Sequence, residues 1–326
     1  MVVIGPFEHG SLLINGREIY FQNGRASVSD EIGNELIKRP GYRKVENKLQ
    51  IKQEQKPIRI ERTGVENRVI KPSDIKPVTL MRYRDDIDVS IIIPTYNRLE
   101  DIKNCVASIY DNTKAITYEI IIVDGTGVAA EYFSDHTPIV YLKDTENLGA
   151  THAFNFGFMN AMGKWTVWLN DDTIVTKDWL KIALEFMDKN PGVGLGAFFF
   201  REQDENGKYV VFPENVIYDG EYCVRTFASW TIHSTRVYAN FGILKTSLMK
   251  KLNYFNERAF KCYASDTDFS HRVIKNGLDI KPIFGAKVIH LNRQDENRKK
   301  NVFADFQKDT INTWHKYHSM WGVKGI

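Results

Sequence analysis

The sequence predicts an α/β fold in which helices flank a mainly parallel sheet. Four short apolar runs, most of them rich in Ile and Val, are typical of buried strands. Segments with a helical apolar period alternate with these runs. Polar residues and glycines follow the runs directly, as they do at the ligand-binding ends of parallel strands. The 326 residues are 43% hydrophobic, enough for one large core and a small extra module.

The first predicted strand starts at Val89 and stops at Pro94, and helix-cap chemistry follows at residues 97–101. The next helix carries Ile102, Val106 and Ile109 on one face. Further strands are predicted at 118–124, 139–142, 165–169, 237–243 and 282–290, and further helices at 152–162, 245–252 and after residue 264.

Polar side chains gather at the predicted carboxyl ends of the strands. They are Thr95, Tyr96, Asn97, Asp124, Asn147, Asn170, Asp171 and Asp172. Two carboxylates after a buried strand are a usual way to hold a hard divalent cation against a phosphate-bearing substrate. An Asp-Asp pair in this position is also a common turn that caps the next helix.

Five motifs in register resemble the inverting family-2 glycosyltransferases of the GT-A fold. They are residues 92–97, 122–125, 147–149, 153–157 and 169–173. The resemblance runs from about residue 89 to about residue 290, and an extension to 322 stays open. It implies a UDP- or dTDP-sugar donor, a Mn²⁺ or Mg²⁺ cofactor, and transfer of one sugar to an acceptor hydroxyl with inversion.

The resemblance implies a set of residues that bind the nucleotide-sugar: Pro94, Thr95, Tyr96, Asn97, Asp124, Asn147, Gly149, Asn155 and Asp171. Asp124 is expected to accept hydrogen bonds from a base or a ribose, or to be a turn carboxylate. Tyr96 is expected to pack on the base, or to be a half-buried aromatic. Gly157 lies in a predicted helix, where close backbone approach or simple packing would explain it.

The family's metal motif is usually Asp-any-Asp, and here Asn170 takes its first position. Asp172 takes the last position and is the expected metal ligand, although the asparagine removes one charge. His290 ends the last predicted strand, where it would reach the cation or the diphosphate, or be structural. Arg293 and residues 298–300 would close over the diphosphate or form a solvated charge run.

The resemblance assigns the general base to Asp266, which would accept the proton of the acceptor hydroxyl. Ser265 replaces the glutamate that usually precedes it. These residues and Asp268 would equally cap a helix, with Asp268 pairing with Arg272. For the acceptor, Trp230 and Tyr222 are expected to stack on a sugar ring or to be core residues.

Two other classes of function compete with a single-sugar transferase. A catalytically silent GT-A scaffold that binds a nucleotide-sugar or a glycan is kept open by Asn170 and Ser265. A nucleotidyltransferase would need a glycine-rich phosphate loop near the chain start, and none is visible. The net charge of +3 does not argue for nucleic acid. Three unpatterned cysteines and the absence of a signal peptide or long apolar run predict a cytoplasmic protein without a membrane span.

Three regions are predicted. Residues 1–46 form a small β-rich module, with a hairpin that turns at Asn15 and Gly16 and a helix at 30–37. This module faintly resembles segments of bacteriophage proteins, which suggests a phage or bacterial origin. Residues 47–88 form an extended polar arm, either a tether or a means of self-association. Residues 89–326 form the GT-A domain, with a nucleotide-binding half at 89–172 and an acceptor half at 173–326.

Overall fold

The structure is a computed structural model that describes residues 87–133, 139–204, 206–230, 234–293 and 306–321, with short backbone segments before residue 87. The chain divides into two compact units, Met1–Lys56 and Pro57–Ile326, which are described separately. The boundaries predicted at residues 46 and 88 stay predictions.

The N-terminal unit contains a five-stranded sheet in the order β2-β3-β4-β1-β5. Ile14 at the end of β2 pairs with Arg17 at the start of β3, so the predicted hairpin is confirmed. The predicted turn residues, Asn15 and Gly16, lie outside the described residues. The helix predicted at 30–37 falls almost entirely outside the described residues. Within the predicted arm, β6 and β7 form a small antiparallel pair. The bounds are β1 Val2–Ile4, β2 His9–Ile14, β3 Arg17–Gln22, β4 Arg25–Ser27, β5 Arg43–Lys44, β6 Ile58–Arg59 and β7 Val69–Ile70.

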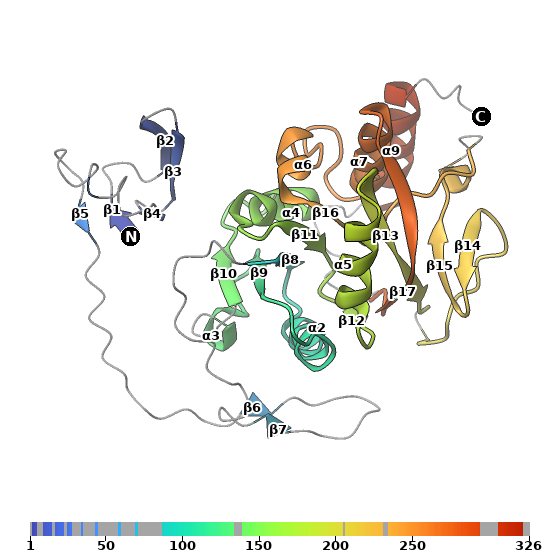
Figure 1. The fold of residues 1–326 in the computed structure, drawn as a ribbon, viewed down its shortest axis with the longest axis horizontal. Helices are drawn as coiled ribbons and strands as arrows, with labels where there is room; N and C mark the ends of the chain where they lie inside the picture. The colour runs from blue at the N-terminus through green and yellow to red at the C-terminus, as the bar shows by residue number, and fades with distance from the viewer. Residues whose placement is uncertain are drawn as a thin grey trace. The chain divides into compact units, whose positions relative to one another are not determined.

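The larger unit is built on a ten-stranded mixed sheet flanked by helices (Figure 1). Its first half is parallel, in the order β10-β9-β8-β11, and contains all four strands predicted from the apolar runs. The bounds are β8 Val89–Thr95, α2 Leu99–Asn112, β9 Tyr118–Asp124, α3 Ala130–Phe133, β10 Ile139–Lys143, α4 Ala150–Asn160 and β11 Trp165–Trp168.

The second half of the sheet is mostly antiparallel. β16 pairs antiparallel with β11, and β13 continues the sheet beside β16 and runs parallel to the long strand β17. The strand predicted at 237–243 begins only at Gly242. The bounds are β12 Thr173–Val175, α5 Trp179–Lys189, β13 Val193–Glu202, β14 Val216–Asp219, β15 Tyr222–Arg225, η2 Phe227–Trp230, β16 Gly242–Lys245, α6 Thr246–Lys251, α7 Ser265–Lys275, β17 Asp279–His290 and α9 Phe306–Trp321.

Pro94 does not stop the first strand, because β8 continues to Thr95. The last residue of β8 that pairs with β11 is Ile92, opposite Trp168. Pro94 lies beyond that pair and is opposite Val123 of β9. Its missing amide hydrogen therefore costs no bond to β11, and a proline is tolerated at the end of a central strand.

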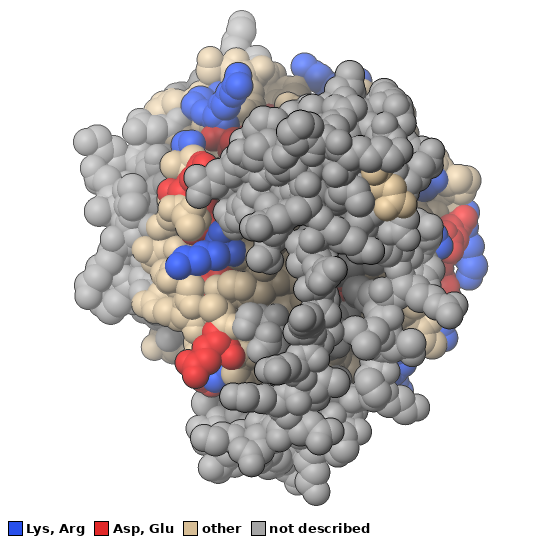
Figure 2. Space-filling model, turned by 90° about the vertical axis from the view of Figure 1, so that its left-hand side faces the viewer, with Lys and Arg blue, Asp and Glu red and all other residues tan. Residues whose placement is uncertain are grey.

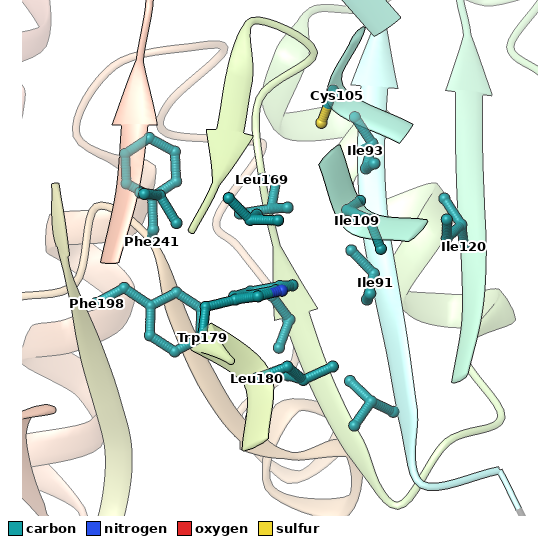
Figure 3. Close-up of a cluster of buried hydrophobic side chains, with 14 of the residues drawn as sticks. Ile91, Ile93, Cys105, Ile109, Ile120, Leu169, Trp179, Leu180, Phe198 and Phe241 are labelled. Carbon is teal, nitrogen blue, oxygen red and sulfur yellow. The ribbon is translucent and has the colours of Figure 1, made fainter. Parts of the chain in front are cut away.

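Both faces of the sheet are buried, as the near-continuous apolar strands predict. On one face Ile91 and Ile93 of β8 belong to a cluster with side chains of α2 and α5. Figure 3 shows Trp179 of α5 and Phe198 of β13 in this cluster, with ring centroids 5.5 Å apart. On the other face Ile92 belongs to a cluster with side chains of α4, α6 and α7. The alternating isoleucines of β8 thus fix the helices on both sides.

Gly157 of α4 is explained by packing between this helix and β8. A Cβ atom at this position would lie 2.4 Å from Cγ2 of Ile92. Only a glycine lets the helix approach the strand so closely, and no ligand is needed to account for it.

The described surface carries charges of both signs. Lys and Arg side chains are interspersed with Asp and Glu on the described part of the face in Figure 2, in keeping with the small net charge. Within the part of the chain that the structure describes, no helix is both long and apolar enough to cross a membrane.

Candidate functional site

A cleft of about 430 Å³ lies at the carboxyl ends of the parallel strands. Its walls come from the ends of β8 and β11, the loop before α4, the segment before β16, the first turn of α7 and the end of β17. The fold brings nine of the predicted site residues to this cleft: Pro94, Thr95, Tyr96, Asn147, Gly149, Asp171, Asp172, Asp266 and His290.

Asp171 is a buried carboxylate with two partners at the cleft. Its Oδ2 accepts a hydrogen bond from Oγ1 of Thr95 at 2.9 Å, and its Oδ1 lies 3.3 Å from the guanidinium of Arg98. Burial and the neighbouring charge of Asp172 raise the pKa of Asp171 to about 7. Two adjacent carboxylates in a low dielectric do not ionise independently, so Asp171 is the one that holds a proton more readily.

Asp172 is the charged member of the pair, and three groups of opposite character surround it. Its carboxylate lies 3.3 Å from Nε2 of His290 and 3.7 Å from Arg98, and it accepts a hydrogen bond from the backbone N–H of Arg293 at 2.8 Å. Burial would raise the pKa of Asp172, but the charge of His290 outweighs it and holds the pKa below its usual range. The resulting ion pair joins the end of β11 to the end of β17.

His290 is positively charged at neutral pH in this environment. Burial lowers the pKa of its imidazole, but the charge and hydrogen bond of Asp172, together with Glu202, raise it to about 9. Nδ1 lies 3.6 Å from Glu202, and Nε2 lies 3.1 Å from Nδ2 of Asn170. Binding of a cation by this ring would require its proton to leave.

The donor atoms at this point suit a weak divalent cation site. Nε2 of His290 lies 3.1 Å from the amide nitrogen of Asn170 and 3.3 Å from the carboxylate of Asp172. A half-turn of the Asn170 amide would bring its oxygen to the same point as a third ligand. The described residues include no group of three or more His, Cys, Asp or Glu side chains placed to hold a metal. A cation held by so few protein ligands would depend on phosphate oxygens of the substrate to complete its shell, as Mg²⁺ often does.

Asp124 is the turn carboxylate that the sequence left as an alternative. Its two oxygens accept hydrogen bonds from the backbone N–H groups of Thr126, Gly127 and Ala129, each at 2.8 Å, and from the hydroxyl of Tyr141 at 2.9 Å. Burial opposes ionisation, but these bonds hold the pKa of Asp124 below its usual value. The carboxylate does not line the cleft, so a contact with the nucleotide would have to replace some of these bonds.

Tyr96 and Asn147 approach each other over Gly125 at the cleft wall. A Cβ atom on Gly125 would lie 2.9 Å from the ring of Tyr96 and 3.1 Å from Oδ1 of Asn147. The glycine of the Asp124-Gly125 motif therefore makes room for both side chains. Asn147 has a positive φ of 49°, a conformation that asparagine adopts more readily than most residues.

Asn155 and Asn97 do not line the cleft. The amide of Asn155 donates to the backbone carbonyl of Phe255 and accepts from the backbone N–H of the same residue, both at 2.9 Å. It also donates to Glu257. Asn155 thus anchors the segment between α6 and α7. Asn97 is exposed, with a φ of 56°, in the loop between β8 and α2.

Asp266 lies in the first turn of α7 and lines the cleft. Oδ1 accepts the backbone N–H of Thr267 at 2.8 Å, and Oδ2 accepts Nδ2 of Asn240 at 3.0 Å. Burial raises the pKa of Asp266 more than these hydrogen bonds and the charge of Arg225 lower it. Within the described residues this carboxylate has no ion-pair partner at hydrogen-bond distance, and a carboxylate with a raised pKa is suited to accept a proton.

Asp268 has the structural role that the sequence offered for it. Its buried carboxylate accepts Nε of Arg272 at 2.9 Å and Nε1 of Trp321 at 3.1 Å, so it ties α7 to the C-terminal helix α9. Tyr222 does not line the cleft, and its ring lies 5.1 Å from the guanidinium of Arg201. The side chain of Trp230 lies outside the described residues.

Sequence reasoning missed several residues that line the cleft. Arg98, Asp144, Glu202, Arg225 and Asn240 belong to this group. Arg98 directly follows the first motif, so its place at a strand end was a usable signal. Glu202 and Arg225 lie in a region where no strand or helix was predicted. Asn240 lies in the strand predicted at 237–243, where nothing indicated a site residue.

Comparisons with known proteins agree with the fold and the motifs. Residues 90–250 match the family model described as glycosyl transferase family 2. An uncharacterized glycosyltransferase of Rickettsia conorii is 27% identical over 156 residues, which are 46% of this chain and 25% of that protein. An uncharacterized glycosyltransferase of Methanocaldococcus jannaschii is 26% identical over 72% of this chain and 80% of that protein. The chain therefore spans about a quarter of the length of the Rickettsia relative.

A solved structure is also similar. The crystal structure of S. aureus TarS 1–349 aligns with 69% of this chain and 65% of that chain, with 18% sequence identity and a TM-score of 0.48. The family model covers both the parallel half of the sheet and the Asp171-Asp172 motif. Through residues 90–250 the chain belongs to glycosyl transferase family 2, and its mixed α/β sheet with flanking helices is a GT-A fold.

Proposed function

We propose that this protein transfers a single sugar from a UDP- or dTDP-sugar to an acceptor hydroxyl, with inversion at the anomeric carbon. The observation that carries the proposal is the shared cleft. It contains the strand-end residues Thr95, Tyr96 and Asp172 and also the carboxylate of Asp266, which has a raised pKa. The acceptor is a glycan, a protein or another molecule with a free hydroxyl.

The proposed reaction is a direct displacement. The acceptor oxygen forms a bond to the anomeric carbon while the bond from that carbon to the diphosphate oxygen breaks. The diphosphate leaves with the bonding electron pair, and Asp266 takes the proton of the acceptor hydroxyl. No bond to the protein forms, so one enzyme carboxylate is sufficient.

The charges at the strand ends suit a leaving diphosphate. Arg98 places a positive group at the cleft beside Asp172. Its guanidinium would stabilise phosphate oxygens through charge-assisted hydrogen bonds. In the proposal Asn170, Asp172 and a deprotonated His290 would hold Mn²⁺ or Mg²⁺, which when bound would neutralise charge on the diphosphate.

A screen of nucleotide-sugars tests the function. The purified protein is heated with UDP, dTDP and a panel of their sugars, each with Mn²⁺ or with EDTA, because a ligand of the folded state raises the melting temperature. Nucleotide release from the stabilising donor is then measured. Stabilisation by a UDP- or dTDP-sugar together with release of its nucleotide supports the proposal. The absence of stabilisation by every such donor contradicts it.

A silent binding protein is the second candidate. The observation that favours it is the engagement of both Asp172 oxygens by His290 and the backbone of Arg293. Stabilisation without any nucleotide release, in the presence of a broad set of hydroxyl acceptors, would favour this binder over the transferase. A cytoplasmic location and self-association through residues 47–88 stay predictions from the sequence.

A further inference from the structure

We propose that Asn240 is a positioning residue that holds the Asp266 carboxylate ionised and oriented toward the acceptor. The proposal rests on the proposed function, in which Asp266 is the base. Asn240 lies in the segment before β16, 26 residues from Asp266 in the chain, and both residues line the cleft. Asn240 lies within the strand predicted at 237–243 but was not predicted as a site residue.

The contact between the two side chains holds the second carboxylate oxygen of Asp266 in place. Nδ2 of Asn240 donates to Oδ2 of Asp266 at 3.0 Å. Oδ1 of Asp266 is already held by the backbone N–H of Thr267 at 2.8 Å and by its hydroxyl at 3.3 Å. Because each oxygen has a donor, rotation of the carboxylate about χ2 would break both sets of bonds. The remaining lone pairs therefore keep one direction.

The backbone around Asn240 is held by hydrogen bonds to β11 and α7. Its backbone carbonyl accepts Nε1 of Trp168 at 2.8 Å, and Trp168 is the last residue of β11. The preceding residue, Ala239, donates its backbone N–H to Oγ of Ser270 at 3.2 Å. Ser270 lies one helical turn after Asp266 on α7. The backbone that carries the Asn240 side chain is thus hydrogen-bonded both to β11 and to α7, the helix that contains Asp266.

The Asn240 side chain makes a contact that stability alone does not explain. Its Oδ1 is buried and has no hydrogen-bond partner among the described residues. A buried acceptor without a partner destabilises a fold, so a residue selected for packing would be apolar here. The presence of an amide here is explained if its N–H₂ group acts on Asp266.

A neutral donor suits this task better than a cation. A lysine or arginine in hydrogen-bond contact would lower the basicity of the carboxylate strongly. The ionisable groups that face Asp266 from neighbouring elements are Arg225 of β15 and Tyr317 of α9, and Asp268 shares its helix. Asn240 is a direct donor to the carboxylate that adds no charge of its own. It favours the ionised form while leaving it able to take a proton.

Loss of this donor should raise the pKa of the Asp266 carboxyl. A hydrogen bond to the charged form lowers a pKa, so its removal in Asn240→Ala is expected to shift the titration upward by about one pH unit. The acidic limb of the pH profile for nucleotide release should move upward by the same amount. Donor affinity should stay unchanged, because the substitution leaves the strand ends intact.

Carboxyl-carbon NMR of protein labelled at the aspartate side chains tests the inference without a substrate. The Asp266 signal is assigned by its absence in Asp266→Asn, and its titration is compared in wild type, Asn240→Ala and Ser270→Ala. The serine variant is the control, because it loosens the same segment but leaves the Asn240 contact. An upward shift in Asn240→Ala alone supports the inference. The same midpoint in wild type and Asn240→Ala, or an equal shift in Ser270→Ala, overturns it.

Two further measurements separate the inference from the proposed function. If Asn240→Ala fails to fold, Asn240→Leu, which is similar in size, replaces it in the titration. With an active donor, Asn240→Ala should slow nucleotide release in wild type but add little to Asp266→Asn. An equal slowing in both backgrounds overturns the positioning role. If no donor is turned over, the proposed function fails, and the NMR titration still decides whether Asn240 controls the Asp266 carboxylate.

Discussion

Replacing Asp266 by asparagine should slow sugar transfer and, at neutral pH, raise the melting temperature. The substitution is nearly isosteric and keeps an oxygen for the backbone N–H of Thr267. Its new amide nitrogen would face Nδ2 of Asn240. A flip of Asn240 turns its Oδ1, which has no partner in the described part of the chain, toward this nitrogen and restores a hydrogen bond. The folded structure can therefore accept the change.

The two effects have different physical origins. Loss of a positioned general base costs about 10²–10⁴-fold in rate. Burial raises the pKa of Asp266 above its usual value, so the folded protein holds this proton more tightly than the unfolded chain does. At pH 7 the charged carboxylate therefore destabilises the fold, and this penalty disappears as the pH falls through the folded-state pKa. Asp266→Asn removes the penalty at pH 7 and changes little at low pH.

Thermal unfolding between pH 4 and pH 8, combined with nucleotide release at pH 7, measures both effects. The melting temperature of Asp266→Asn is expected to exceed that of wild type at pH 7 and 8 and to converge with it toward pH 4. Release of nucleotide should fall by the factor given above, with donor affinity retained. A variant that transfers sugar at the wild-type rate, or that melts below wild type at every pH, would refute the reasoning.

Three further outcomes are expected. Asp172→Ala should abolish the Mn²⁺ dependence of UDP binding in a thermal shift assay, because the main carboxylate ligand is lost, and a variant that still responds to Mn²⁺ would contradict the assignment. Asp268→Ala should lower the melting temperature by roughly 5–10 °C, since it leaves Arg272 without its buried partner, with near wild-type nucleotide release per folded molecule; an unchanged melting temperature would count against it. Gly157→Ala should destabilise the protein by about 1–3 kcal/mol in urea unfolding, because the added Cβ meets Ile92 at 2.4 Å, and a wild-type midpoint would disprove the overpacking.

The parallel half of the sheet could be predicted from the sequence because its signals are local. The Ile and Val runs at 91–93 and 120–123 are long enough to need burial on both faces, and each ends in a motif with polar residues. The strand ends of one parallel sheet meet at one edge, so Thr95 and Asp171 were expected near each other. They form a hydrogen bond at 2.9 Å.

The second half was harder to predict because its determinants are contacts between distant segments. β13 has an apolar run with glycines at 194 and 196. A Cβ atom at these positions would collide with Leu278 and Ile283, so the need for glycine depends on contacts with distant residues. Asn240 has no motif of its own, and its place follows from bonds to Trp168 and Asp266. Asp124 differs from Asn240 because its motif could be recognised in the sequence. The hydrogen bonds to its carboxylate could not be predicted, because they depend on the backbone conformation of residues 126–129.

The reversal of direction at β11 has a consequence for how this architecture can vary. β11 runs parallel to β8 on one side and antiparallel to β16 on the other, so the chain leaves β11 and enters β16 at the same edge of the sheet. Everything between Thr173 and Asn240 is inserted between those two points. Much of this stretch is core, because α5 packs in the buried cluster with β8 and β13 lies inside the sheet. The part after β13 carries the outer strands β14 and β15, and it can vary without moving the ends of β8 and β11. Under the proposed function, a chimera that exchanges residues 203–236 with those of a relative would keep the ends of β8 and β11 and change the part of the cleft wall that contains Arg225, which should alter acceptor choice.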